Sequence, residues 1–325
     1  MNGVTPVLEL NDVAVHFGAR ASLFKPLPSP VRAVDGIDLS VAPGETVGLV
    51  GESGCGKSTL SNAIVGLLRP TRGSIRIQGQ EIAGANTALL RVVRRNVQMI
   101  FQDPALSLNP RATIGSAIAE PLAVHGIARG QALKDRVANL LEQVGLKAEH
   151  AARYPHQFSG GQRQRVVIAR ALALEPALVV CDEPVSALDV SVRAQILNLL
   201  VDLQRRMGVS YLFVSHDLAV VRHICDRVAV MYLGRIVELA SRDTLFSNPR
   251  HYYTRALMAS VLEPDPVAQR AKTRSMLSGE LPSPSNVPSG CAFHTRCPAA
   301  TAVCTAERPE LTVRPDGALV ACHHA

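Results

Sequence analysis

Short apolar runs alternate along the chain with segments in which apolar residues recur every three or four positions. The runs predict strands at Val7–Phe17, Thr46–Val50, Ile75–Ile77, Val97–Phe101, Leu178–Cys181, Ser210–Val214 and Val228–Tyr232. The longer segments predict helices at Lys57–Leu68, Thr113–Val124, Gln131–Val144, Gly161–Ala173, Ser191–Arg206 and Leu218–Ile224. Strands that alternate with helices are typical of an α/β fold, so we predict a largely parallel sheet. Residues from about 103 to 175 are mostly helical in pattern, which predicts a helical subdomain inserted into that sheet.

The C-terminal part of the chain has a different pattern. Prolines recur between residues 264 and 288 in a stretch rich in serine and charge, which predicts a partly extended linker. Four of the seven cysteines follow close together, at Cys291, Cys297, Cys304 and Cys322. We therefore expect a main domain at residues 1–263, a Pro-rich linker at 264–289 and a small Cys-rich tail domain at 290–325.

Composition and charge narrow the class of protein. With 47% hydrophobic and 19% charged residues, the chain can bury a large core, which excludes wholesale disorder. The net charge of +7 comes from basic residues interspersed with acidic ones, which favours a solvated surface over a nucleic-acid interface. No apolar run reaches the roughly 18 residues that cross a bilayer, and the N-terminus does not resemble a signal peptide. We therefore expect a cytosolic or peripheral protein.

A glycine-rich loop follows the predicted strand Thr46–Val50 and precedes a predicted helix. Its sequence, Gly51–Ser58, matches G-x-x-x-x-G-K-S, in which glycines let successive backbone N–H groups turn toward phosphate oxygens. Lys57 is expected to meet the β- and γ-phosphates, and Ser58 to offer a hydroxyl to Mg²⁺. The predicted nucleotide-binding residues here are Gly51, Ser53, Gly54, Cys55, Gly56, Lys57, Ser58 and Thr59.

Two carboxylates end the predicted strand at Leu178–Cys181. Asp182 is placed to hold Mg²⁺ through water, and Glu183 to act as general base toward the water that attacks the γ-phosphate. A strand end that merely meets solvent would look the same, but it would leave the matching phosphate loop upstream unexplained.

A second anion-binding helix start lies at Ser159–Gln162, directly before the helical run that follows. Ser159 is a good N-cap, and Gly160 and Gly161 leave their backbone N–H groups uncovered. One ATP needs only one phosphate loop, so this second site suggests a nucleotide that is held by another chain.

Together these segments resemble the ATP-binding cassette of an ABC transporter. Gly51–Ser58 resembles its Walker A loop, Val179–Glu183 its Walker B strand, and Ser159–Gln162 its signature, with Phe158 where leucine is commoner. Gln102 falls at the Q-loop, Asp189 in the D-loop and His216 at the switch histidine. The resemblance implies a P-loop NTPase fold with a mixed, largely parallel sheet, and an ATPase that uses ATP and Mg²⁺.

The same resemblance assigns roles to individual residues. Glu183, His216 and Gln102 would be catalytic, and Ser58 and Gln102 would reach Mg²⁺. Ser159, Gly160, Gly161, Gln162 and Asp189 would contact the ATP of a second cassette. Phe17 would stack on adenine, with Phe24 as the alternative.

Further segments resemble the oligopeptide/dipeptide importer branch of this family. They include Gln102–Arg111, Glu120–Leu122, Tyr154–His156, Asp182–Asp189 and the Cys-rich tail. This resemblance implies an ATP-hydrolysing subunit that powers import of dipeptides and oligopeptides at the cytoplasmic face of the bacterial cytoplasmic membrane, bound peripherally. The implied partners are a paralogous ATPase subunit, two membrane permease subunits and an extracytoplasmic peptide-binding protein, with no nucleic acid.

The spacing of the tail cysteines does not match common zinc or ferredoxin motifs. Four thiolates can still hold a [4Fe–4S] cluster if the fold brings them together, and the branch resemblance favours that cluster. Zinc, with His294, His323 or His324 replacing a cysteine, stays an alternative, as do free thiols and disulfides.

Three other functions compete with this interpretation. The same ATPase role would serve another cargo, such as nickel or glutathione. A non-transport ABC protein usually carries two cassettes in one chain, and no internal repeat is present here. A P-loop kinase or GTPase would have no use for Ser159–Gln162.

Overall fold

The computed structural model describes residues 5–18, 30–260 and 280–325. The chain divides into two compact units. The helical unit comprises Met1–Leu8, Ser40–Glu45 and Arg76–Phe213, and the phosphate-loop unit comprises Glu9–Leu39, Thr46–Ile75 and Val214–Ala325. Two predictions fall on residues outside the described ranges: Phe24, and the linker from 264 to 279.

The phosphate-loop unit is built on buried strands. Parallel pairing joins β3 (Thr46–Val50) to β9 (Arg227–Tyr232), and antiparallel pairing joins β9 to β10 (Arg235–Ser241). All five residues of β3 are buried, as expected for a strand that is covered on both faces. Within its described residues, the helices of this unit are α1 (Lys57–Ile64), α8 (Leu218–Ile224), α9 (Arg242–Ser247), α10 (Tyr252–Ala259) and α12 (Ala302–Ala306).

Further strands of this unit belong to a second sheet. Its strand order runs β2 (Val31–Val41), β1 (Leu8–Phe17), β4 (Arg72–Ile77) and β5 (Gln80–Glu81). Buried and exposed residues alternate along the second half of β2, which indicates one covered and one solvated face. The prediction had found β1 and the end of β4 but not β2.

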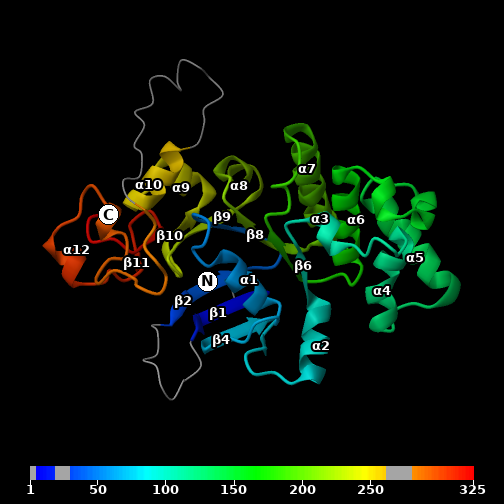
Figure 1. Ribbon diagram of the computed structural model, residues 1–325, viewed down its shortest axis with the longest axis horizontal. Helices are drawn as coiled ribbons and strands as arrows, with labels where there is room; N and C mark the ends of the chain where they lie inside the picture. Colours follow the sequence, from blue (N-terminus) through cyan, green and yellow to red (C-terminus); the bar gives the residue numbers. More distant parts are fainter. Residues whose placement is uncertain (1–4, 19–29, 261–279) are drawn as a thin grey trace, which may run out of the picture. The chain divides into compact units, whose positions relative to one another are not determined.

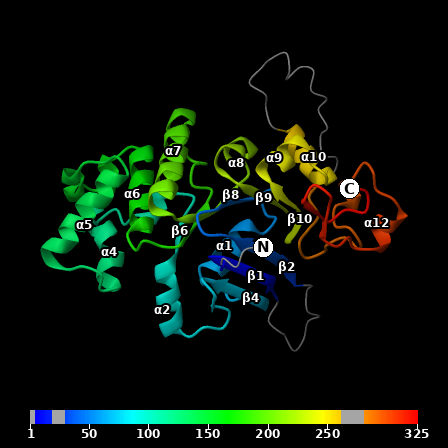
Figure 2. The same ribbon diagram turned by 180° about the vertical axis from the view of Figure 1, so that it is seen from behind.

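The helical unit has its own parallel strands. β6 (Val97–Ile100) pairs with β7 (Leu178–Asp182), and β8 (Ser210–Ser215) follows β7 in the sheet order. Residues 103–175 hold no strand, and Figures 1 and 2 show α4, α5 and α6 side by side. The helices are α2 (Thr87–Asn96), α3 (Pro104–Ser107), α4 (Ile114–Val124), α5 (Gly130–Gln143), α6 (Gly160–Leu172) and α7 (Val190–Met207), with short 3₁₀ turns at Ala148–Ala152 and Pro155–Gln157.

Side chains at the helix starts explain where these helices begin. Asn86, Asp103, Thr113 and Ser159 each accept a hydrogen bond from a backbone N–H in the first turn of the following helix. The predicted end of α1 was wrong: the helix ends at Ile64 rather than Leu68, because the chain turns at Gly66 with a φ of 70°.

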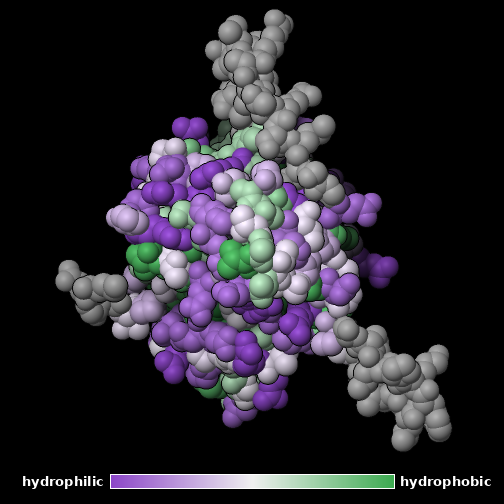
Figure 3. All heavy atoms as spheres, turned by 90° about the vertical axis from the view of Figure 1, so that its left-hand side faces the viewer, coloured by the Kyte–Doolittle hydropathy of each residue, from purple (hydrophilic) through white to green (hydrophobic). Residues whose placement is uncertain are grey.

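The Cys-rich tail is attached to β10, in the sheet that also contains β3 and β9. β12 (Leu319–Val320) pairs antiparallel with β10, and β11 (Thr312–Val313) pairs with β12 (Figure 1). Phe293 and Val320 are buried. A segment too small for a core of its own thus gains order from the sheet edge. The face that presents this tail is mostly hydrophilic, with hydrophobic residues in small groups (Figure 3).

Among the helices of the described ranges, none combines the length and the apolar character needed to cross a lipid bilayer.

Candidate nucleotide site

The candidate phosphate loop connects β3 to α1 in a backbone path that requires glycine. At Gly56 the φ is 108°, and a Cβ atom would lie 1.9 Å from the carbonyl oxygen of Ala33. At Gly51 a Cβ atom would lie 2.2 Å from the carbonyl oxygen of Met231. Because another segment of backbone lies this close, neither position can carry a side chain.

Lys57 is the first residue of α1, and its side chain turns back over the loop. Its Nζ donates to the carbonyl oxygens of Gly51 at 2.7 Å and of Glu52 at 2.9 Å. The residue is only 6% exposed, so its positive charge is largely removed from water. An ammonium held this way, at a loop rich in backbone N–H groups, suits a phosphate group.

The start of α1 leaves backbone donors available for an anion. The N-cap is Gly56, and no side chain caps the helix there. In this first turn Ser58 is exposed and Thr59 is half-buried. In the loop before it, Ser53 and Gly54 are also exposed. Cys55 is buried next to Lys57, and burial raises the pKa of its thiol, which gives it no role as a nucleophile.

In the helical unit, the end of β7 lies next to the Q-loop residue. The amide Nε2 of Gln102 donates to Glu183 Oε2 at 3.0 Å. Asp182 ends the strand and is buried, whereas Glu183 has a φ of 49°, in the left-handed region that non-glycine residues rarely adopt. The left-handed backbone at Glu183 and the hydrogen bond from Gln102 together fix the direction of the Glu183 carboxylate, as a general base requires.

Ser159 starts α6 with a reciprocal pair of hydrogen bonds. Its hydroxyl accepts from the N–H of Gln162 at 3.3 Å, and its own N–H donates to Gln162 Oε1 at 3.0 Å. Phe158, just before it, is buried and packs edge-on against His150. The apolar residue at this position therefore anchors the helix start.

Gly161 packs against the helix that follows the D-loop. A Cβ atom there would lie 2.4 Å from Val192 Cγ1, whereas one at Gly160 would meet Leu188 at an ordinary 3.6 Å. Asp189, the N-cap of α7, is exposed and makes no side-chain cap hydrogen bond. The signature glycine Gly161 thus packs directly against α7 within the helical unit.

This contact predicts the result of a pair of substitutions. Gly161→Ala should lower the free energy of unfolding by about 1–3 kcal/mol because it overpacks Val192. Gly160→Ala should have little effect on stability, and Val192→Ala should restore the stability of the Gly161→Ala variant. Denaturant unfolding of the four proteins measures this, and equal stability of both glycine variants would contradict it.

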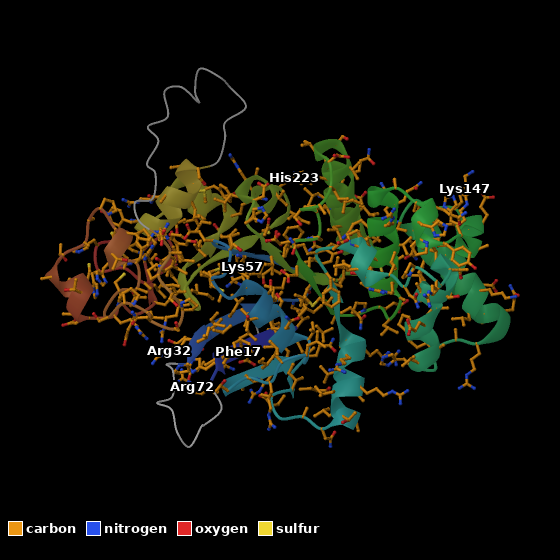
Figure 4. All side chains as sticks on the ribbon, in the orientation of Figure 1. Phe17, Arg32, Lys57, Arg72, Lys147 and His223 are labelled. Carbon is orange, nitrogen blue, oxygen red and sulfur yellow. The ribbon has the colours of Figure 1, made fainter. Side chains whose placement is uncertain are left out.

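The remaining predicted residues lie in the phosphate-loop unit. Phe17 ends β1 with 46% of its surface exposed, near the starts of β2 and β4 at Arg32 and Arg72 (Figure 4). His216 is exposed directly after β8 and before Asp217, which caps α8. The structure thus divides the predicted site residues between the units. Phe17, the phosphate loop and His216 belong to one, and Gln102, Asp182, Glu183, the signature and Asp189 to the other.

The four tail cysteines are free thiols that influence one another. Burial raises the pKa of Cys291, Cys297 and Cys322, and neighbouring tail cysteines raise each further. Cys304 Sγ lies 3.5 Å from His324 Nε2. Within residues 5–18, 30–260 and 280–325, no three His, Cys, Asp or Glu side chains form a group that could hold a metal ion. Four thiols in one short segment are a donor set that suits a [4Fe–4S] cluster or zinc, although they do not form a ready-made metal group in this arrangement.

Two contacts to the phosphate loop were missed by the sequence analysis. Glu52 donates its backbone N–H to the Tyr253 hydroxyl at 2.8 Å, and its carboxylate forms an ion pair with Arg296. The partners are 201 and 244 residues apart in the sequence, and no local pattern signals either contact.

A buried histidine supports Tyr253. His251 Nδ1 accepts a hydrogen bond from the Tyr253 N–H at 3.0 Å, and its ring lies 5.6 Å from that of Phe293. Burial, with the nearby charge of Arg255, lowers the pKa of His251 to about 4. The imidazole is therefore neutral in the folded protein, as its acceptor role requires.

This lowered pKa predicts an acid-sensitive fold. Below pH 6.5 the unfolded chain protonates His251 and the folded protein does not, so stability falls until about pH 4, by up to about 3 kcal/mol. His251→Asn keeps an acceptor for the Tyr253 N–H and should remove this part of the pH dependence. Buried Glu238, whose pKa is raised by burial, contributes the opposite slope in both proteins. Thermal unfolding from pH 7 to pH 4 tests this, and identical pH profiles would contradict it.

Comparisons with known proteins agree with this geometry. The family model described as "ABC transporter" matches residues 34–186, and that described as "Oligopeptide/dipeptide transporter, C-terminal region" matches residues 237–304. Among solved structures, an ATP-binding cassette in a dimeric post-hydrolysis state bound to ADP and Pi is 29% identical, with a TM-score of 0.63, over 72% of this chain and 98% of that one. A subunit of an ABC transporter complex from Clostridium perfringens is 26% identical, with a TM-score of 0.64, over 75% and 92%.

Curated relatives match over nearly the whole chain. An oligopeptide transport ATP-binding protein of Bacillus subtilis is 50% identical over 98% of this chain and 97% of its own length. One from Escherichia coli is 54% identical over 96% and 95%, and a di/tripeptide transport ATP-binding protein of Pseudomonas aeruginosa is 49% identical over 98% of both. The chain is therefore an ATP-hydrolysing member of the ABC transporter family, and it belongs to the branch of oligopeptide and dipeptide transport ATP-binding proteins.

Proposed function

We propose that the chain hydrolyses ATP to power import of dipeptides and oligopeptides across the bacterial cytoplasmic membrane. The observation that carries the cargo is the identity of about half of all residues to peptide transport ATP-binding proteins over nearly the full length. The observation that supports the chemistry is the Glu183 carboxylate, held by Gln102 at the end of a buried strand.

We assign the catalytic steps to the chain's own residues as follows. Lys57 and the N–H groups of the phosphate loop bind the β- and γ-phosphates, and Phe17 stacks on adenine. Glu183 accepts the proton of the attacking water, which Gln102 and His216 orient. Mg²⁺, reached by Ser58, Gln102 and Asp182, would neutralise phosphate charge; their oxygen atoms are the donors that this ion prefers.

The signature supports a site shared between two cassettes. Ser159–Gln162 opens α6 with glycines and an uncharged N-cap, which suits an anion, and the chain's own phosphate loop already supplies one anion site. One of the similar solved structures is described as a dimer. We therefore propose that Ser159, Gly160, Gly161, Gln162 and Asp189 contact ATP on a paralogous ATPase subunit.

Membership of the family implies membrane permease partners. We propose two permease subunits, contacted by the helical part at about 103–175, and an extracytoplasmic peptide-binding protein that delivers cargo. The ATPase would then be peripheral on the cytoplasmic face. We likewise keep the division into a cassette at 1–263, a linker at 264–289 and a tail domain at 290–325 as a proposal.

Co-purification tests the proposed cargo. Affinity-tagged chain, purified from gently solubilised membranes of its own organism, should bring down two permeases and a second ATPase. The binding protein, identified from the same operon or complex, should retain peptides. A binding protein loaded with nickel, glutathione or another small solute would instead establish the alternative cargo.

For the tail we propose that the four cysteines take up a [4Fe–4S] cluster, with zinc as the alternative. The support is the donor set itself: four thiols lie in one short segment, and other tail cysteines raise the pKa of Cys291, Cys297 and Cys322. Metal binding would release the thiol protons, as ligation by thiolate requires. Anaerobic purification followed by iron, sulfide and zinc analysis decides: iron and sulfide near four per chain support the cluster, and metal-free protein refutes both.

A further inference from the structure

One ion pair links the Cys-rich tail to the candidate phosphate loop. Arg296 donates from Nη1 to Glu52 Oε2 at 2.7 Å and from Nη2 to Glu52 Oε1 at 3.0 Å. Only 5% of the Arg296 side chain and 28% of the Glu52 side chain are exposed. A two-point contact of this kind fixes both the position and the plane of the carboxylate.

Glu52 is also the residue on which Lys57 rests. Its carbonyl oxygen accepts from Lys57 Nζ at 2.9 Å, and its N–H donates to the Tyr253 hydroxyl at 2.8 Å. The backbone and the side chain of Glu52 are thus held from different directions. A movement of its carboxylate would be transmitted to the loop that carries Lys57.

The tail holds Arg296 firmly in turn. The backbone N–H of Arg296 donates to the carbonyl oxygen of Phe293 at 3.0 Å. The Phe293 ring packs against Tyr232 and Tyr253, with centroids 5.4 and 5.5 Å apart. The packed aromatic cluster therefore fixes the backbone from which the Arg296 guanidinium reaches the loop.

The sign of the charges shows what the pair does. An unpaired carboxylate in the second position of a phosphate loop would repel a triphosphate, and Arg296 cancels that charge. A buried ion pair contributes little net stability, so stability alone does not account for it. With Glu52 neutralised, the charge of Lys57 remains for the phosphates.

We propose that Arg296 is a positioning residue for ATP: it neutralises Glu52 and holds the phosphate loop in a form that accepts a triphosphate. The Cys-rich tail is then part of the nucleotide site rather than an appendage. This inference rests on the proposed binding of ATP by the phosphate loop.

Equilibrium ATP binding and steady-state hydrolysis by the full-length chain in its transporter complex test the proposal. Arg296→Gln should raise the Kd for ATP about three- to tenfold, with kcat at saturating ATP little changed, and the increase should shrink as salt screens the charge. Glu52→Gln in the same chain should restore the affinity, because it removes the carboxylate that Arg296 neutralises. A purely structural role of Arg296 would give no such rescue.

A matched control is Arg308→Gln, which removes a positive charge from the tail at a residue that lies 3.7 Å from Asp35. It should leave ATP affinity unchanged. Wild-type affinity of Arg296→Gln, failure of the rescue, or an equal effect of Arg308→Gln would each overturn the proposal. If Arg296→Gln does not fold, Glu52→Gln alone decides: equal or tighter ATP binding supports the proposal and weaker binding overturns it. Lys57→Met tests the loop itself, so its failure to weaken ATP binding would refute the proposed function instead.

Discussion

Replacing Glu183 with glutamine will slow ATP hydrolysis by about 10²–10⁴-fold while ATP binding is retained. The substitution keeps the size of the side chain and an oxygen that can accept from Gln102, which now donates to Glu183 Oε2 at 3.0 Å. It removes only the capacity to take a proton from water. The loss should therefore appear in kcat rather than in the Kd for ATP.

The measurement is single-turnover hydrolysis by purified complex, with nucleotide binding determined in parallel. Glu142→Gln, on the exposed face of α5, serves as a control with the same chemical change and should hydrolyse at the wild-type rate. Hydrolysis by the Glu183→Gln complex at the wild-type rate would show that another group is the base.

Replacing Lys57 with methionine will weaken ATP binding on the order of 10–10²-fold, and hydrolysis at limiting ATP will fall with it. The ammonium is the only charged group of the loop that is buried, and its two carbonyl contacts at 2.7 and 2.9 Å aim it across the loop. Methionine fills the same space, so the loss reports the charge and not a cavity.

Lys147→Met is the matched control for this substitution. Its side chain is 77% exposed and belongs to the helical unit (Figure 4), so the change should leave ATP affinity unaltered. Isothermal titration with ATP and Mg²⁺ measures both variants. Equal affinities of the two variants for ATP would show that Lys57 does not contribute to ATP binding.

Local signals allowed much of the fold to be predicted. The strands β3, β6, β7, β8 and β9 and the helices α4 to α8 lie within a few residues of their predicted places. These strands are short apolar runs, the helices have apolar periodicity, and several helices begin at a cap in their own sequence, such as Ser159 before α6. Elements that depend on distant pairing were missed, since two-residue strands such as β12 exist only through their contact with β10.

In the candidate site, too, features with a local sequence signal could be predicted and contacts between distant residues could not. The phosphate loop could be located from spacing alone, because Gly51 and Gly56 meet a backbone requirement that the sequence displays. The signature was located from its serine and glycines, and Ser159 does cap α6. The hydrogen bond between Gln102 and Glu183 spans 81 residues, and the ion pair between Arg296 and Glu52 spans 244, so neither has a local signal. For the tail, the cysteine pattern predicts a metal site. The described residues hold no group of three His, Cys, Asp or Glu side chains that could bind an ion, so the cluster stays a prediction.

The central claim is that hydrolysis at this chain's nucleotide site drives peptide import. The most direct test is uptake of a labelled oligopeptide into liposomes that contain the complete transporter, with binding protein outside and MgATP inside. We predict uptake by the wild-type complex and none above background with Glu183→Gln, although both complexes bind ATP. Uptake at the wild-type rate by the Glu183→Gln complex would contradict the account.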